Sequence, residues 1–227
     1  MCMVTVAINK DFGVIAADSA RDENGTLSYE FPKLKFLGGR YLVTAIGSPL
    51  FIARLDYSKF KEDMGSLSVY MEGYFKEVQP SVENAAKKLN LDPAYQKPTI
   101  CAFVLGVHGG KPTLAMFNSY LNFKPKYLFS DDKIKFATIH YGGDVAGKKK
   151  IFEDTTAYME KRFHKMEKKG VPITPGSVGE ILVRGIYKKS DLEMDLLPHK
   201  KYSGGVPSVA FIQSNGDAFP LSNVILQ

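Results

Sequence analysis

The sequence predicts an α+β protein in which two stacked, largely antiparallel sheets carry a pair of helices on each outer face. This arrangement is a four-layer αββα sandwich, and three observations predict it. Segments follow one another in the order strands, two helices, strands, two helices, strands. Residues 100–105 are apolar at every position, as expected of a strand covered on both faces. The 227 residues, 44% of them hydrophobic, suffice for one domain over 1–227 with an apolar core.

The first half of the chain supplies four strands and then a helix pair. Short apolar runs separated by turn residues predict strands at 4–8, 14–17, 34–37 and 41–46. A polar, glycine-containing segment at 22–28 lies between the two strand pairs. Ser48 is a favourable N-cap and Pro49 a favourable first helical position, and the apolar stripe of that helix ends at Met64. A second helical stripe covers 82–89.

The second half repeats this pattern. Strands are expected at 99–107, 113–118, 127–130, 135–139, 208–213 and 218–226. Between them, a first helix carries an apolar face made of Phe152, Met159, Phe163 and Met166. A second helix opens with the capping-box pattern of Ser177 and Glu180. The dipeptide Asn215-Gly216 predicts the turn between the last two strands.

Composition argues against several classes of protein. The net charge of +6 is concentrated in basic residues at 148–169, but acidic residues are interleaved there, so we expect a solvated helix face and no nucleic-acid partner. No segment has the roughly 20 apolar residues of a membrane span, and no secretory signal precedes the first strand. We therefore expect no membrane partner and a cytoplasmic location. Two cysteines make no disulfide framework, and the scattered histidines and absent phosphate loop predict neither metal nor cofactor.

Five segments resemble motifs of the proteasome β-subunit family, which includes the bacterial proteasome-like ATP-dependent peptidase. Residues 13–19, Gly-Val-Ile-Ala-Ala-Asp-Ser, are similar to the second strand of that family. Residues 32–36, Pro-Lys-Leu-Lys-Phe, resemble the strand that opens with its catalytic lysine. Residues 43–48 and 140–144 resemble its glycine turns, and 202–205 match its Tyr-Ser-Gly-Gly motif. The resemblance implies the N-terminal nucleophile hydrolase fold, which is the αββα sandwich.

The resemblance also implies that the nucleophile is the first residue of the mature chain. The family's interval, counted back from Asp18, assigns this role to Cys2, which removal of Met1 would expose. The α-amino group of Cys2, with an ordinary pKa of about 7.7–8.0, would then serve as the base. Thr5 is a competing nucleophile if a short leader is cleaved, although it lies three residues nearer to Asp18.

Four further residues complete the implied site. Lys33 would favour the thiolate by its positive charge, and Asp18 would hold Lys33 in position. The backbone N–H of Gly47 would stabilise the oxyanion of the tetrahedral intermediate, and Ser203 would hydrogen-bond near the amine. Lys35 is a rival of Lys33 because residues two apart on a strand share a face, but the spacing to Gly47 favours Lys33.

Two positions depart from the family pattern. Lys200 stands where the family has an aspartate, and Tyr141 stands where it has a serine. The leading hypothesis is hydrolysis of peptide bonds in a peptide or protein substrate, by a homo-oligomeric ring of the kind that works with an ATPase partner. The alternatives are a non-peptidase amidase or acyl-transfer enzyme of the same fold, and a catalytically inactive structural subunit.

Overall fold

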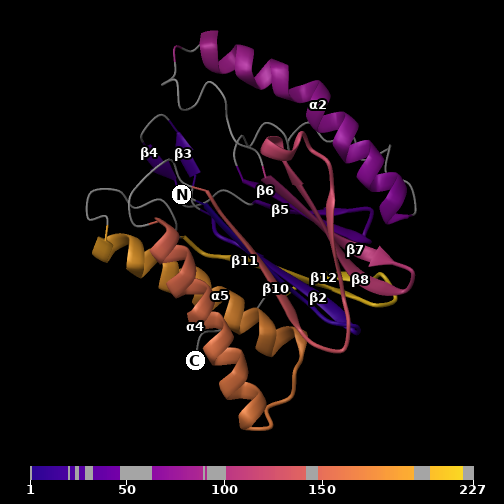
Figure 1. Cartoon of the computed structure of the whole chain (residues 1–227), viewed down its shortest axis with the longest axis vertical. Coiled ribbons are helices and arrows are strands. Elements are labelled where there is room, and N and C mark those ends of the chain that lie inside the picture. Colours follow the sequence, from indigo (N-terminus) through magenta and orange to yellow (C-terminus); the bar gives the residue numbers. More distant parts are fainter. Residues whose placement is uncertain are drawn as a thin grey trace.

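The structure is a computed structural model that describes residues 2–19, 21–23, 26–28, 33–46, 63–88, 90, 101–141, 148–196 and 205–221. In this part the chain is a mixed α+β protein with two five-stranded antiparallel sheets, a small hairpin and three α-helices. The α-helices are α2 (Met64–Lys88), α4 (Lys148–Lys168) and α5 (Pro175–Leu196). Figure 1 shows α2 on one side of the sheets and the α4–α5 pair on the other.

The first sheet joins the beginning and the end of the chain. Its strand order is β10-β1-β2-β11-β12. The bounds are β1 (Cys2–Ile8), β2 (Phe12–Ala17), β10 (Lys135–Tyr141), β11 (Ser208–Gln213) and β12 (Ala218–Pro220). β1 lies between β2 and β10, with Val4 opposite Ala17 on one side and Cys2 opposite Tyr141 on the other. The start of β1 is therefore held from both sides.

The second sheet is a meander with the order β5-β6-β7-β8-β9. Its strands are β5 (Leu34–Leu37), β6 (Tyr41–Ile46), β7 (Cys101–His108), β8 (Lys111–Asn118) and β9 (Lys126–Phe129). The β5–β6 and β7–β8 hairpins turn at Gly38-Gly39 and Gly109-Gly110, and all four glycines have positive φ. Tight hairpin turns of the primed type require this conformation, which glycine adopts without steric cost.

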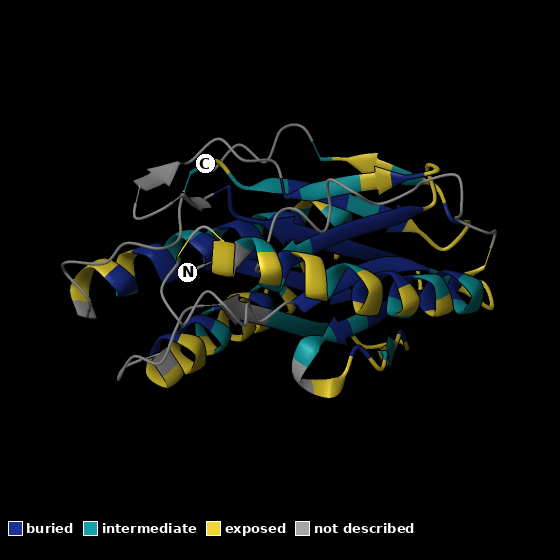
Figure 2. Cartoon of the chain, turned by 90° about the horizontal axis from the view of Figure 1, so that it is seen from above, coloured by how far each residue is buried: buried dark blue, intermediate teal, exposed yellow. Residues whose placement is uncertain are grey.

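Alternation along β1 shows how the two sheets share the core. Val4, Val6 and Ile8 pack against Phe103 and Leu105 of β7, in a cluster between the two sheets. Met3 and Ala7, on the opposite face, belong to a cluster with residues of α4 and α5. Side chains of a strand point alternately to its two faces, so β1 is covered on both. Figure 2 shows these central strands buried and the outward faces of the helices exposed.

The other face of the second sheet is covered by α2. Leu67, Met71 and Phe75 pack against Val43 and other buried residues of β6, β7 and β8. The ring of Phe75 also stacks on that of Phe123, with 5.1 Å between ring centroids and 13° between ring planes. This cluster is the third apolar core of the described part, after the one between the sheets and the one under α4 and α5.

The expected strands are confirmed, with small shifts in their ends, wherever the structure describes them. The polar segment 22–28, for which the sequence predicted no strand, contributes to a hairpin of β3 (Arg21–Glu23) and β4 (Thr26–Ser28). Residues 48–62 of the helix expected from Ser48 lie outside the described residues, and so do residues 222–226 of the last expected strand. Met64 was placed at the end of that helix, but it is the first residue of α2.

Two details of α4 and α5 differ from the sequence prediction. Phe152 was expected on the apolar face of α4, but it is 39% exposed and Ile151 is buried instead. The capping box at the start of α5 was placed one turn too late. Thr174 is the N-cap, because its Oγ1 accepts the Ser177 N–H at 3.2 Å while the Ser177 hydroxyl accepts the Thr174 N–H at 3.0 Å. Pro175 then occupies the first helical position.

The close approach of β6, β7 and α2 generates a prediction about Gly106. A Cβ added to Gly106 would lie 2.5 Å from the Tyr41 ring and 2.5 Å from the Met64 methyl group. Because Tyr41 is buried and cannot swing away, we expect Gly106→Ala to lower the free energy of unfolding by about 1–3 kcal/mol. The control is Gly73→Ala on the exposed side of α2, where nothing lies within 4 Å.

At Gly73 the substitution should instead raise stability by about 0.5–1 kcal/mol, because glycine is a poor helix former. Urea unfolding followed by circular dichroism measures both changes. A Gly106→Ala protein as stable as the parent would contradict the packing described between Tyr41 and β7.

Candidate active site

Asp18 lies where β2 leaves the first sheet. It follows the last residue of β2, and its backbone N–H donates to the carbonyl of Met3 at 3.1 Å. This bond continues the β1–β2 pairing one residue beyond Val4 and Ala17. Asp18 therefore lies beside the residue that follows Cys2. It is 1% exposed, which is rare for a carboxyl group without a charged partner.

The charged partner of Asp18 is Lys33. Lys33 directly precedes β5 and is 4% exposed, and its Nζ forms an ion pair with Asp18 Oδ1. The pair links the end of β2 in one sheet to the start of β5 in the other. Lys35, two residues later, lies within β5 opposite Val43 and is half-buried. The structure thus brings Lys33 to Asp18.

The environment of Asp18 acts on its pKa in opposite directions. Burial raises the pKa of this carboxyl above its ordinary value, because the low-dielectric interior disfavours the charged form. The charge and hydrogen bond of Lys33, the charge of Lys189 and a hydrogen bond that the carboxylate accepts from the Met3 backbone lower its pKa, without cancelling the effect of burial. The second oxygen, Oδ2, is buried and has no hydrogen-bond partner among the described residues. Ionisation of Asp18 therefore depends on the two neighbouring lysines.

Lys189 belongs to a second buried ion pair, which the sequence analysis missed. Its Nζ lies 2.5 Å from Glu193 Oε1, and both side chains are fully buried. A signal for this pair was present in the sequence. Counted from Leu182, the residues Ile186, Lys189 and Glu193 follow at intervals of four, three and four, so the two charges continue the apolar stripe of α5. Opposite charges on the inner face of a helix indicate a buried pair.

Thr5, the competing nucleophile, lies in the core. It is fully buried, and its Oγ1 is 3.3 Å from Thr138 Oγ1 and 3.8 Å from the sulfur of Met159 on α4. A hydroxyl enclosed between the first sheet and α4 is inaccessible to a substrate in this fold.

The remaining site residues lie at the margin of the described structure. Cys2 is described by its backbone, which begins β1 opposite Tyr141. Gly47 and Ser203 lie outside the described residues, as does Lys200. The described part of the site is therefore the Asp18–Lys33 pair, the residue-2 end of β1 beside it, and Lys189 nearby.

Cys101, the other cysteine, is buried and does not have the properties of a nucleophile. It begins β7 between Ile46 and Asn118 of the neighbouring strands and is 8% exposed. Burial raises the pKa of its thiol to about 11. The thiolate is the reactive form, so Cys101 is held in its unreactive state at neutral pH.

No protein-family model matches this sequence, and no curated protein matches it either. Among the described residues, no group of three or more histidine, cysteine, aspartate or glutamate side chains is arranged to hold a metal ion. None of the helices in that same part is both long and apolar enough to cross a bilayer.

The buried Lys189–Glu193 pair generates a prediction about stability. Glu193→Gln leaves the Lys189 charge in the interior without its carboxylate, so we expect the free energy of unfolding to fall by about 3–5 kcal/mol. Replacing both residues, as Lys189→Met with Glu193→Leu, removes both charges and should cost far less than Glu193→Gln alone.

The control is the exposed pair of Lys76 and Glu72 on α2, which has the same four-residue spacing. Glu72→Gln should change stability by at most about 0.5 kcal/mol, because solvent screens an exposed pair. Urea unfolding of the four proteins measures these differences. Equal losses for Glu193→Gln and the double variant would show that the pair is not energetically coupled.

Proposed function

We propose that this chain is an N-terminal nucleophile hydrolase of the proteasome type, which cleaves amide bonds in peptide or protein substrates with Cys2 as nucleophile. The single observation that carries the proposal is the buried Asp18–Lys33 ion pair beside the residue-2 end of β1. Strand and loop residues far apart in sequence meet there in a dry environment. A fixed positive charge in such surroundings acts strongly on the protonation of neighbouring groups.

The proposed reaction begins with the thiol of Cys2. After removal of Met1, the α-amine of Cys2 takes the thiol proton while the sulfur bonds to the carbonyl carbon of the substrate. The tetrahedral oxyanion that forms is stabilised by the backbone N–H of Gly47. The carbon–nitrogen bond then breaks, and the leaving amine receives the proton from the α-amine. Water hydrolyses the resulting thioester, which releases the carboxylic acid and restores the thiol.

Lys33 and Asp18 have separate tasks in this scheme. The Lys33 ammonium favours the thiolate of Cys2 and lowers the pKa of its amine, while Asp18 fixes the position of Lys33. Ser203 orients the amine by a hydrogen bond. The second, unpartnered oxygen of Asp18 is a further acceptor in this neighbourhood.

The arrangement of the described elements supports the same proposal. Cores lie between α2 and the second sheet, between the two sheets, and between the first sheet and the α4–α5 pair. This order is compatible with the αββα sandwich of the family. We extend the proposal to a homo-oligomeric ring and an ATPase partner, which the resemblance implies.

One observation favours the alternative of an inactive structural subunit. Tyr141, whose backbone is paired with that of Cys2, stands where the resemblance implies serine, and Lys200 replaces an acid. A tyrosine at that position is far bulkier than serine, and a lysine inverts the local charge. Intact-mass measurement separates the two functions, because an N-terminal nucleophile requires the loss of Met1.

The catalytic proposal predicts a graded set of rates on a panel of fluorogenic peptides. Cys2→Ala should abolish turnover, and Lys33→Ala should reduce it at least about 100-fold, as expected for loss of one preorganised charge. Asp18→Asn should cost less than Lys33→Ala if Asp18 only positions Lys33. Lys35→Ala, the matched control on the same strand, should keep nearly full activity. Full activity of Cys2→Ala would overturn the nucleophile assignment.

The two cysteines should differ in their reaction with iodoacetamide at pH 7. Because the Cys101 pKa is raised to about 11, only about one part in ten thousand of its thiol is ionised at that pH. We expect brief labelling to modify Cys2 alone, and Cys101 to react after unfolding in urea. Peptide mapping by mass spectrometry gives the result, and preferential labelling of Cys101 in the folded protein would be incompatible with the proposal.

A further inference from the structure

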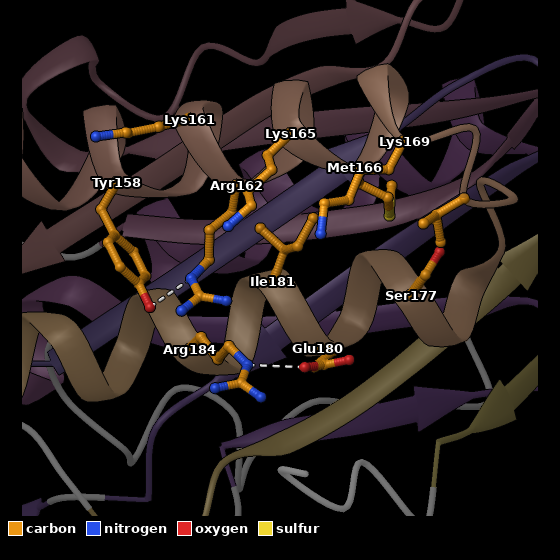
Figure 3. Close-up of a pocket in the computed structure, with 11 residues that line it drawn as sticks. Tyr158, Lys161, Arg162, Lys165, Met166, Lys169, Ser177, Glu180, Ile181 and Arg184 are labelled. Atoms are coloured by element: carbon orange, nitrogen blue, oxygen red, sulfur yellow. Dashed lines mark hydrogen bonds and ion pairs between the residues drawn. The ribbon is translucent and has the colours of Figure 1, made fainter.

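A basic groove runs between α4 and α5 on the side away from the sheets. It has a cavity volume of about 610 Å³, within the range of sites that bind small molecules or peptide segments. Its cations are Lys161, Arg162, Lys165, Lys169 and Arg184. Glu180 is the one carboxylate in the lining, so the formal charge of the groove is +4. Figure 3 shows Arg162 and Lys165 of α4, and Lys169 directly after it, extending toward α5.

Basic and acidic residues that are interleaved in the sequence of α4 lie on different faces of this helix. Lys161 and Lys165 share one face of α4, and Lys169, the residue that follows α4, continues this four-residue spacing and still donates its N–H to the Lys165 carbonyl at 3.2 Å. Glu160 and Glu167 are exposed but do not line the groove, and Glu167 pairs with His164 instead. The acidic residues thus leave the groove face of α4 basic.

Both arginines are held in place by their Nε–H groups. Arg162 donates to the Tyr158 hydroxyl at 2.6 Å, and its guanidinium lies 4.9 Å from the centre of the Tyr158 ring. Arg184 donates to Glu180 Oε1 at 2.7 Å. Neither contact involves the lysines. Within the described residues, the ammonium groups of Lys161, Lys165 and Lys169 have no carboxylate partner.

Unpaired like charges one helical turn apart repel each other, and a bound anion would relieve this repulsion. The groove also has apolar lining. Met166 is half-buried and Val171 at one end is 42% exposed, whereas Ile181 is buried. A ligand that fills the groove must therefore combine negative charge with apolar side chains.

We propose that the basic groove binds an acidic peptide segment of a partner protein. Four helical residues span about 6 Å, and Lys169, which directly follows α4, keeps a helical hydrogen bond to the Lys165 carbonyl. Alternate side chains of an extended peptide lie at nearly the same spacing, about 6.6–6.8 Å. Glutamates at alternate positions reach successive lysines, and the residues between them turn their apolar side chains to the opposite wall.

Nucleic acid fits the groove less well. Binding of single strands relies on aromatic faces on which bases stack. Tyr158 is the one aromatic residue in the groove, it is half-buried, and the Arg162 guanidinium lies over its ring. The groove is also separate from the Asp18–Lys33 pair. It is lined by residues in the first half of α5, whereas Lys189, the α5 residue whose charge acts on Asp18, lies in the second half.

The test measures binding of a fluorescein-labelled peptide in which glutamate alternates with leucine, by fluorescence polarisation at physiological salt. Lys165→Gln with Lys169→Gln should weaken binding about 10-fold, the effect of losing two charge pairs in a partly enclosed site. The matched control, Lys150→Gln with Lys168→Gln, removes the same charge from exposed positions of α4 outside the groove and should change affinity less than about 2-fold.

Two altered probes complete the experiment. A peptide with glutamine in place of glutamate, and one with serine in place of leucine, should each bind more weakly than the parent peptide. Equal weakening by both double variants would overturn the proposal, because the net charge of the protein and not the groove would then carry binding. Tighter binding of a single-stranded oligonucleotide or of anionic phospholipid vesicles, abolished by Lys165→Gln with Lys169→Gln, would replace the peptide by that ligand.

Discussion

The two sheets bury each other's inner faces and are covered by helices on their outer faces, and the rest of the structure follows from this constraint. A strand such as β1 or β7 has no face in water, so its side chains must be apolar or fully paired. β1 satisfies the rule with Val4 and Val6 on one side and Met3 on the other. The charged side chains that are buried beside these strands in the described part, Asp18 and Lys33, are paired with each other.

At the candidate site, the buried side chains are paired charges and not apolar groups. Asp18 and Lys33 are paired where β2 ends in one sheet and β5 begins in the other. Lys189 and Glu193 form a second buried pair on α5. Charges in a low-dielectric interior interact more strongly than at the surface, and their desolvation costs more. Four buried charges so close to one strand end are a costly arrangement for stability alone.

The helix α5 serves two different environments. Its inner face contributes Leu182, Ile186 and Lys189 to the interior, and its outer face contributes Glu180 and Arg184 to the basic groove. The inner charges act in a dry setting near Asp18, whereas the groove is open to solvent, where salt screens each charge. α5 thus carries weakly screened, buried charges near the candidate active site and strongly screened, solvent-exposed charges in the basic groove.

Local sequence patterns determined most of the described fold. Short apolar runs defined the strands, and turn residues between them, such as Gly38-Gly39, defined the hairpins, because each pattern favours one backbone conformation. The chemistry of Asp18 and Lys33 came from a family resemblance, since fifteen residues of separation say nothing of contact. Only the tertiary structure decided that the Asp18 carboxyl at the end of β2 meets the Lys33 ammonium before β5 in the interior. Contact between two such segments depends on how the two sheets pack, and spacing along either segment alone does not contain that information.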